Sequence, residues 1–220
     1  MRSGLYLLLT SNDVVVQDFS GQVCGYHYFT LPSVVGYTLP FAWVGNSQKL
    51  CLGVCAYPFV ISDYIPGLKP LKTSNGDMGV DGMVSVIGHE IAELATNPFL
   101  NAWYGSRHGQ DPSLKLEIVD LCEGIYGTSG GGSYTEQLLN GEDGAAFNKN
   151  GIRRRFLVQW VWNRVVNYCS GIRIAIPIPL VTGASLQKIT LHIKLDNDDY
   201  NKKCLLHQVL IQKKNIYIYI

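Results

Sequence analysis

The sequence predicts a single α/β domain built on a mixed sheet. Residues 5–18 and 23–29 are rich in β-branched and aromatic residues, as strands are, and two later segments have the apolar spacing of helices. A chain of 220 residues that is 47% apolar and 16% charged can bury one sizeable core. Residues 31–77 are interrupted by Pro and Gly, and no element is assigned there.

The first helix is expected over residues 82–96. Asp81 can cap its N-terminus, and Pro98 ends it because the residue before a proline disfavours the helical conformation. The apolar stripe that would face the core consists of Met83, Ile87, Ile91 and Leu94.

The second helix is expected over about residues 152–168, with Gly171 just beyond its end. Its apolar face would consist of Phe156, Trp160, Val161, Val165 and Tyr168. Both helices are expected to pack on the strands.

The composition of the chain changes near residue 170. Residues 1–170 carry 11 Lys and Arg against 14 Asp and Glu, a net charge of −3, whereas residues 171–220 carry 7 against 3, a net charge of +4. We therefore expect a body at residues 1–170 and an atypical, poorly ordered tail at residues 171–220. The alternative is that Ile172, Ile174 and Ile176 alternate in a strand that completes the sheet.

The composition also excludes several classes of protein. No stretch approaches the roughly 18 to 20 consecutive apolar residues of a membrane span. Neither part of the chain has the dense basic face of a nucleic-acid-binding protein. The apolar run at residues 5–9 is shorter than the core of a secretion signal, so no export signal is expected within the chain itself.

The cysteines indicate an oxidising compartment. Five lie in the body, at positions 24, 51, 55, 122 and 169, and Cys204 lies in the tail. Cys51 and Cys55 are separated by three residues and no second such pair exists, which argues against a zinc site made of cysteines. Disulfides are expected, with one body cysteine left over and the pairing open; buried thiols are the alternative.

The strongest chemical signal is the segment Gly88-His89-Glu90-Ile91-Ala92-Glu93 on the first predicted helix. Residues four apart share a helix face, so His89 and Glu93 can reach one metal ion while Glu90 lies beside it. Imidazole and carboxylate groups bind zinc, and Glu90 can take a proton from a zinc-bound water. The segment predicts a zinc site, with Gly88 leaving room beside His89.

A third zinc ligand must come from elsewhere in the chain. Glu117 and Asp120 are the nearest acidic candidates, one as a ligand and the other as the group that orients His89.

Two alternatives compete with a metal site on this helix. Its acidic residues can simply face water, or they can pair with Arg153–Arg155 from further along the chain. No Lys or Arg lies between Asp77 and Tyr104 to pair with them locally, which favours a cation.

Several segments of the body carry a specific family resemblance. They are VQDF at 16–19, CGYHYF at 24–29, GYTLP at 36–40, AWVGN at 42–46, CLGVCAYP at 51–58, and residues 89–98, 117–126 and 151–169. Together these segments resemble the plant EXORDIUM and phosphate-induced protein family, from Gly4 to about Ser170. The resemblance ends where the composition changes.

The resemblance implies a secreted protein of the plant cell wall (the apoplast) that acts in growth and cell expansion, linked to brassinosteroid or nutrient responses. Its partner would be a cell-wall component or an extracellular protein. Members of the family are longer at the N-terminus and carry an export signal there, so this chain is expected to be N-terminally incomplete with an unrelated tail. The family also resembles zincin-like proteins, which implies that His89, Glu90 and Glu93 form a zincin-like active-site helix with Glu93 in place of the usual histidine.

Three functions follow from these observations. The leading one is an extracellular growth-response protein that acts by binding or signalling, with no biochemical activity assigned. The second is a zinc-dependent hydrolase of peptide bonds, with Glu90 as the catalytic base and His89, Glu93 and either Glu117 or Asp120 as zinc ligands. The third is a phosphate or glycan binder that uses Arg153–Arg155.

Overall fold

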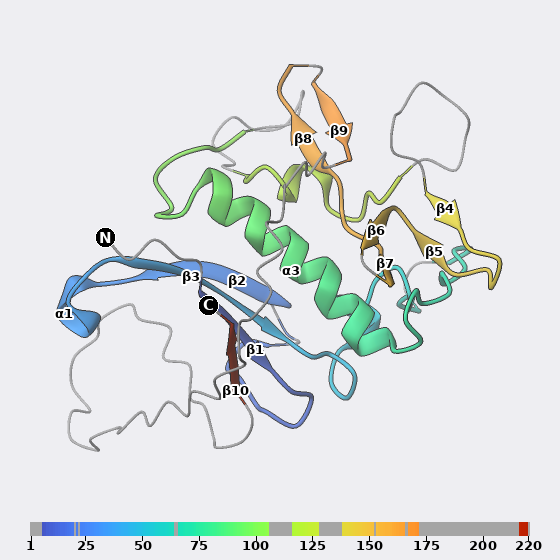
Figure 1. Ribbon diagram of the computed structural model, residues 1–220, viewed down its shortest axis with the longest axis horizontal. Helices are drawn as coiled ribbons and strands as arrows, with labels where there is room; N and C mark the ends of the chain where they lie inside the picture. Colours follow the sequence, from blue (N-terminus) through green and yellow to red (C-terminus); the bar gives the residue numbers. More distant parts are fainter. Residues whose placement is uncertain are drawn as a thin grey trace.

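A computed structural model describes residues 6–19, 21, 23–63, 66–105, 116–127, 138–151, 153–165, 167–171 and 216–219. In these ranges a four-stranded mixed sheet is covered on one face by a single long helix, α3 (Figure 1). The mixed α/β class expected from the sequence is confirmed.

The sheet has the strand order β10-β1-β3-β2. Its strands are β1 (Tyr6–Thr10), β2 (Gly25–Thr30), β3 (Leu39–Gly45) and β10 (Ile216–Tyr219). The central strand β3 runs parallel to β1 and antiparallel to β2, and β10 runs antiparallel to β1. Strands β1 and β2 fall in segments predicted as strands, but β3 lies in the segment to which no element was assigned.

The two faces of the sheet bury different kinds of residue. On one face Tyr26 and Trp43 lie directly opposite each other, with ring centroids 5.5 Å apart, and Phe19 meets Trp43 edge-on at 5.4 Å. This face forms the main apolar cluster of the molecule together with Val14 and Val16. The opposite face carries Gly25, His27, Ala42 and Val44 and lies under α3, because side chains alternate along a strand.

Helix α3 (Met78–Thr96) lies between the sheet and the hairpins that follow it in the chain (Figure 1). It begins about one turn earlier than predicted, because Asp77 rather than Asp81 is the N-cap and accepts a hydrogen bond from the Val80 N–H at 3.0 Å. Asp81 instead lies buried in the first turn, where Asn75 donates to it from its backbone N–H and its side-chain amide.

The buried face of α3 is small and polar rather than apolar. Ile91, expected in the core, is 39% exposed, whereas Leu94 is buried as predicted. The buried residues of the helix are Gly79, Asp81, Gly82, Ser85, Glu90, Glu93 and Leu94. The side of Gly88 is occupied by Val158, whose Cγ1 would lie 2.6 Å from an added β-carbon. Gly88 therefore makes space for the Val158 side chain. The open space beside His89 that the sequence led us to expect is not present.

The predicted helix at residues 152–168 is wrong. This segment contains β7 (Arg154–Phe156), β8 (Val161–Asn163) and the start of β9 (Tyr168–Ser170). The backbone N–H groups of Trp160 and Trp162 donate to Ile125 and Ile118 instead of to a preceding helical turn. Trp160 is 2% exposed and Val165 is 91% exposed, so the apolar residues do not share a face. β-Branched valines and partners on a distant segment outweigh the helical spacing here.

The remaining elements are short. Strand β7 pairs with β6 (Lys149–Gly151), β8 pairs with β9, and β4 (Leu139–Asn140) pairs with β5 (Ala146–Phe147). Single turns of helix are α1 (Pro32–Val35), α2 (Leu52–Cys55) and the 3-10 turn η1 (Asp120–Cys122). None of the helices in the described part of the chain combines the length and apolarity needed to cross a bilayer.

Two disulfides tie these short elements to the rest of the body. Cys24, just before β2, is bonded to Cys55 of α2, and Cys122 of η1 is bonded to Cys169 of β9. Cys51 is buried and belongs to neither disulfide. The expected disulfides are therefore present, while Cys204 lies outside the described residues.

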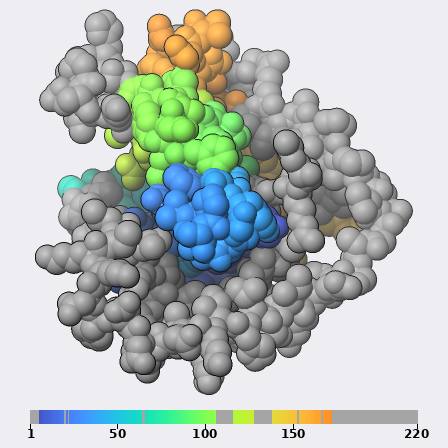
Figure 2. Space-filling model, turned by 90° about the vertical axis from the view of Figure 1, so that its left-hand side faces the viewer, coloured from blue at the N-terminus to red at the C-terminus, as the bar shows by residue number. Residues whose placement is uncertain are grey.

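The ends of β2 and α3 meet at one side of the molecule. The ring of Phe29 on β2 packs edge-on against Phe99, which follows α3, with centroids 5.7 Å apart. Figure 2 shows this side, where blue residues from the N-terminal part of the chain adjoin green residues. In the tail, residues 216–219 form β10 beside β1, whereas Ile172, Ile174 and Ile176 lie outside the described residues.

The glycines of α3 yield a test of this packing. A β-carbon at Gly82 would lie 2.8 Å from the Ala56 Cα and 2.9 Å from the Cys55 carbonyl, so Gly82→Ala must push α3 away from α2. We expect a loss of about 1–2 kcal/mol in the free energy of unfolding, although alanine is favoured over glycine by about 1 kcal/mol in an open helix. Urea unfolding of the variant and the wild type measures this loss in the free energy of unfolding.

Ala95, on the exposed side of the same helix, is the matched control. Ala95→Gly should cost about 1 kcal/mol through helix propensity. A Gly82→Ala variant that is more stable than wild type would contradict the close packing of α3 on α2.

Candidate metal centre

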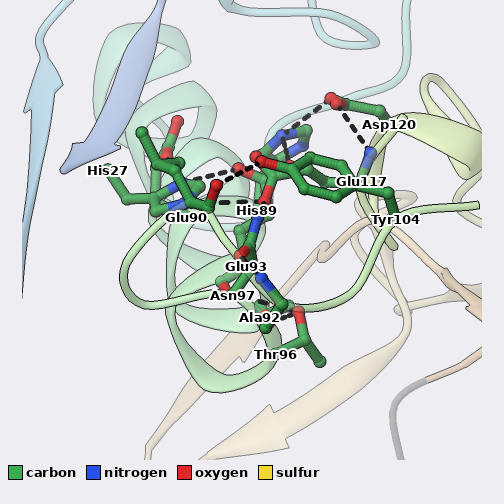
Figure 3. Close-up of polar contacts among 12 residues, drawn as sticks. His27, His89, Glu90, Ala92, Glu93, Thr96, Asn97, Tyr104, Glu117 and Asp120 are labelled. Atoms are coloured by element: carbon green, nitrogen blue, oxygen red, sulfur yellow. Dashed lines mark hydrogen bonds and ion pairs between the residues drawn. The ribbon is translucent and has the colours of Figure 1, made fainter. Parts of the chain in front are cut away.

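Six polar side chains from three separate segments meet at the buried face of α3 (Figure 3). One comes from β2, three come from α3, and two come from residues 117–120, a segment that ends at the first residue of η1. They are His27, His89, Glu90, Glu93, Glu117 and Asp120. The structure therefore brings together all five site residues predicted from the sequence and adds His27.

His89 faces two carboxylates. Its Nε2 lies 2.9 Å from Glu93 Oε1 and 3.4 Å from Asp120 Oδ1. The pair at 2.9 Å does not have hydrogen-bond geometry, since Glu93 Oε1 is buried without a hydrogen-bond partner in the described part of the chain. Asp120, rather than Glu117, is therefore the acidic residue that joins His89 and Glu93.

His27 lies on the other side of Glu93. Its Nδ1 is 3.1 Å from Glu93 Oε2 and 3.6 Å from Glu90 Oε2, and its Nε2 is 3.6 Å from Glu117 Oε1. Because His27 is on the strand face that α3 covers, it is only 6% exposed. Glu117 thus belongs to the His27 side of the cluster.

Long-range contacts fix the segment that carries Glu117 and Asp120. The Gln159 side-chain amide donates to the Val119 carbonyl at 2.8 Å, the Trp162 N–H donates to Ile118 at 2.9 Å, and the disulfide at Cys122 holds η1 to β9. The Asn97 amide at the end of α3 donates to Glu117 Oε1 at 2.5 Å. These contacts hold both carboxylates over α3.

The neighbouring carboxylates set the charge state of both histidines. Burial lowers the pKa of His27, but Glu90 and Glu93 outweigh it and raise that pKa to about 10. Burial likewise opposes protonation of His89, yet Asp120 and Glu93 hold its pKa well above its usual value. The carboxylates therefore favour the protonated form of both imidazoles, which is the behaviour of a site that attracts cations.

The carboxylates fall into two groups according to whether their pKa is raised or lowered. Burial raises the pKa values of Glu90 and Glu117. For Glu93, burial is outweighed by contacts with His27 and His89, which lower its pKa, and the contact with His89 lowers the pKa of Asp120. Glu93 and Asp120 are thus the groups most firmly held as anions, and Glu90 and Glu117 are the groups more easily protonated.

A pocket of about 550 Å³ opens onto the cluster. His89, Glu90 and Asp120 reach its wall, together with Tyr126 and the Cys24–Cys55 disulfide. The cluster is therefore accessible to a small molecule or to part of a larger one.

The alternatives to a metal site are not supported by these contacts. Glu90 and Glu93 are each 4% exposed, so they do not face water. Among the described residues, Arg155 pairs with Asp143, at 2.5 Å and 3.0 Å, and not with α3. Within the described ranges, the ion pairs of these carboxylates are with His27 and His89, and Glu117 also accepts a hydrogen bond from Asn97.

The residues of the His89 side fit a zinc ion. Ligand atoms around tetrahedral zinc with bonds of about 2.0–2.1 Å are separated by about 3.3 Å, close to the distances from His89 Nε2 to Glu93 and Asp120. One nitrogen and two carboxylate oxygens leave a fourth position for water or substrate, as in catalytic zinc sites.

Sequence reasoning missed His27. The residue lies on the face of β2 that α3 covers, with the small Gly25 two positions before it and Ala42 opposite it on β3. A lone histidine beside a glycine on the covered face of a strand is the only signal that pointed to it, and its partners are 63 to 90 residues further along the chain.

Comparison with known proteins identifies the family. The family model described as "Phosphate-induced protein 1 conserved region" matches residues 1–172. The chain is 70% identical over 170 residues to Protein EXORDIUM-like 3 of Arabidopsis thaliana, covering 77% of this chain and 50% of that protein. It is 56% identical over 173 residues to Protein EXORDIUM-like 5 of the same plant, covering 77% and 47%.

A more distant relative comes from tobacco. Protein PHOSPHATE-INDUCED 1 of Nicotiana tabacum is 34% identical over 174 residues, covering 77% of this chain and 54% of that protein. The chain thus spans about half the length of the curated relatives it matches, and no solved structure matches it. The chain belongs to the EXORDIUM and phosphate-induced protein family.

Proposed function

We propose that this protein is an extracellular cell-wall protein whose buried cluster binds zinc and supports hydrolysis, with peptide bonds as the substrate class. The observation that carries the metal site is the approach of Glu93 Oε1 and Asp120 Oδ1 to one nitrogen of His89, at 2.9 Å and 3.4 Å, at the wall of an open pocket. These three residues are the proposed ligands.

Zinc bound there would act as a Lewis acid and lower the pKa of a water molecule in the pocket. Glu90 reaches the same pocket from the next position on the helix and is not one of the proposed ligands. Because burial raises the pKa of Glu90, its carboxylate is suited to take up a proton and to return it to a leaving group. Glu93 and Asp120, held as anions, keep the histidine in place.

Glu93 stands where a two-histidine zinc helix has its second histidine, and the helix is in this respect zincin-like. A carboxylate is an accepted zinc ligand, so the substitution preserves binding and changes the charge of the site. The chain covers about half the length of its curated relatives, and the hydrolytic activity is proposed for the part that holds this cluster.

The extracellular part of the proposal is supported by the disulfides. Two disulfides in one small body are typical of proteins that mature in an oxidising compartment. Together with family membership they support a secreted protein of the apoplast that acts in growth and cell-expansion responses, whether brassinosteroid or nutrient linked, on a cell-wall component or an extracellular protein.

Thiol labelling of protein recovered from plant cell walls tests the compartment. After denaturation without reductant, Cys24, Cys55, Cys122 and Cys169 should be protected, because each is held in a disulfide. Labelling followed by peptide mass spectrometry reads each position. Full labelling of these four residues would contradict an oxidising location.

Replacing the central ligand tests the metal site. His89→Ala should remove zinc and lower the free energy of unfolding measured with zinc at a thousandfold excess over its Kd by about 4 kcal/mol, the stabilisation that a ligand of the folded state supplies. Metal analysis and urea unfolding with and without zinc measure both effects. Equal zinc content in wild type and His89→Ala would overturn the site.

Replacing the proposed base tests the hydrolytic step. Glu90→Gln should keep zinc but lower the rate of cleavage of a mixture of quenched fluorescent peptides by about 100-fold or more, because the proton acceptor is lost while the ligands remain. Glu123→Gln is the matched control, since Glu123 lines the same pocket but lies outside the cluster. Zinc binding without cleavage by the wild type would reject hydrolysis and leave a structural metal site.

A further inference from the structure

A second pocket, of about 340 Å³, lies outside the cluster and is formed by the hairpin of β6 and β7 together with Ser74 and Asn75. This hairpin lies beside the start of α3 (Figure 1). The volume is within the range of about 300–1,000 Å³ that small-molecule sites have. The described residues that line the pocket include three arginines and no Asp or Glu. The pocket is therefore positively charged.

Two of the three arginines are available to a ligand. The guanidinium group of Arg155 is held by Asp143, with contacts of 3.0 Å and 2.5 Å. Arg153 and Arg154 are exposed, and within the described ranges neither side chain has an ion pair or a hydrogen bond. Arg154 is paired across the hairpin with Gly151, which has no side chain to cover it. Two guanidinium groups without a counter-charge at one pocket favour an anionic ligand.

The neutral part of the wall offers hydrogen-bond acceptors. The two amide hydrogens of Asn75 are engaged within the fold, one with Asp81 Oδ1 at 2.6 Å and the other with the Arg155 carbonyl at 3.0 Å. The Ser74 hydroxyl donates its hydrogen to the Ala146 carbonyl. The oxygen atoms of these two side chains are thus the atoms left to a ligand, and they accept hydrogen bonds. A ligand with hydroxyl groups satisfies them, whereas an anion without hydrogens to donate does not.

A buried carboxylate fixes this part of the wall. Asp81 is 3% exposed and accepts hydrogen bonds from both the backbone N–H and the side-chain amide of Asn75. Because Asn75 is also bonded to β7, the wall and the hairpin are held together before a ligand binds. A preformed wall lowers the entropy that binding must cost.

The backbone at Arg153 adds a further observation. Arg153 lies in the turn between β6 and β7 with a φ of 61°, in the left-handed region. Asparagine and glycine are the residues that such hairpin turns favour. An arginine at this position is therefore explained by its side chain rather than by the turn.

We propose that this pocket binds a carboxylated sugar unit of an acidic polysaccharide. Arg153 and Arg154 hold the carboxylate, and Ser74 and Asn75 accept hydrogen bonds from hydroxyl groups of the sugar. The choice of a polysaccharide rests on the cell-wall location in the proposed function, whereas the pocket itself is separate from the zinc cluster.

Isothermal titration calorimetry with an oligosaccharide of galacturonic acid tests the proposal. The full chain, stripped of metal and kept in phosphate-free buffer, should bind this oligosaccharide. The fully methyl-esterified oligosaccharide should bind about 10-fold more weakly or less, because its carboxylates are uncharged. Arg153→Asn and Arg154→Gln should each weaken binding by about 10-fold, since each removes a charge-assisted hydrogen bond.

Lys49→Asn is the matched control, because it removes a positive charge from an exposed position outside the pocket and should leave binding unchanged. Arg153→Asn should keep the fold, since asparagine adopts a positive φ more readily than arginine does. Far-ultraviolet circular dichroism checks this for each variant, and Arg154→Gln tests the same pocket independently.

Four results would overturn the proposal. Absence of binding by the wild type rejects the site, and equal binding of the charged and esterified oligosaccharides rejects recognition of the carboxylate. An equal loss in Lys49→Asn and Arg153→Asn indicates attraction by the overall charge alone. Displacement by inorganic phosphate as effective as displacement by galacturonic acid identifies a simple anion site. Because the protein is free of metal throughout, failure of the zinc site leaves all of these results unchanged.

Discussion

The burial of Glu90 and Glu93 against the sheet is the constraint on which the rest of the structure depends. A buried carboxylate without a partner costs several kcal/mol, so each must meet a cation or a hydrogen-bond donor within the fold. His27 supplies this from the sheet and His89 from the helix. The most buried face of α3 is therefore held by charge as much as by apolar contact.

This constraint determines the residues around the carboxylates. A β-carbon at Gly25 would lie 2.9 Å from Glu90 Oε1 and 2.8 Å from the Trp43 carbonyl, so only glycine leaves space for the Glu90 side chain at this point of β2. The main apolar cluster therefore lies on the opposite face of the sheet, where Trp43 and Phe19 are buried. The segment with Glu117 and Asp120 then closes the cluster, held by a disulfide and by Gln159.

Local patterns in the sequence were sufficient for part of this arrangement. The helix predicted at residues 82–96, the strands β1 and β2 and the acidic partners at 117 and 120 follow from local composition, from apolar spacing and from Pro98 after the helix. The strand β3 did not follow, because Pro40 and flanking glycines obscure it, although it is central and buried. The segment at residues 152–168 has helical spacing, yet its backbone pairs with residues more than 30 positions earlier, which no local pattern records. His27 was missed for the same reason, since its significance depends entirely on α3 and Glu117.

The presence of glutamate at position 93 has a physical reason in this geometry. The Glu93 carboxylate offers one oxygen to His89 and the other to His27, so a single side chain serves both imidazoles. A histidine at position 93 would remove a negative charge and place a third imidazole against His27 in the absence of water. The fold would then lose the contact that holds β2 to this part of α3. Glu93 is therefore best understood as the shared anion of the cluster, and the difference from a two-histidine helix is a consequence of His27 on the sheet.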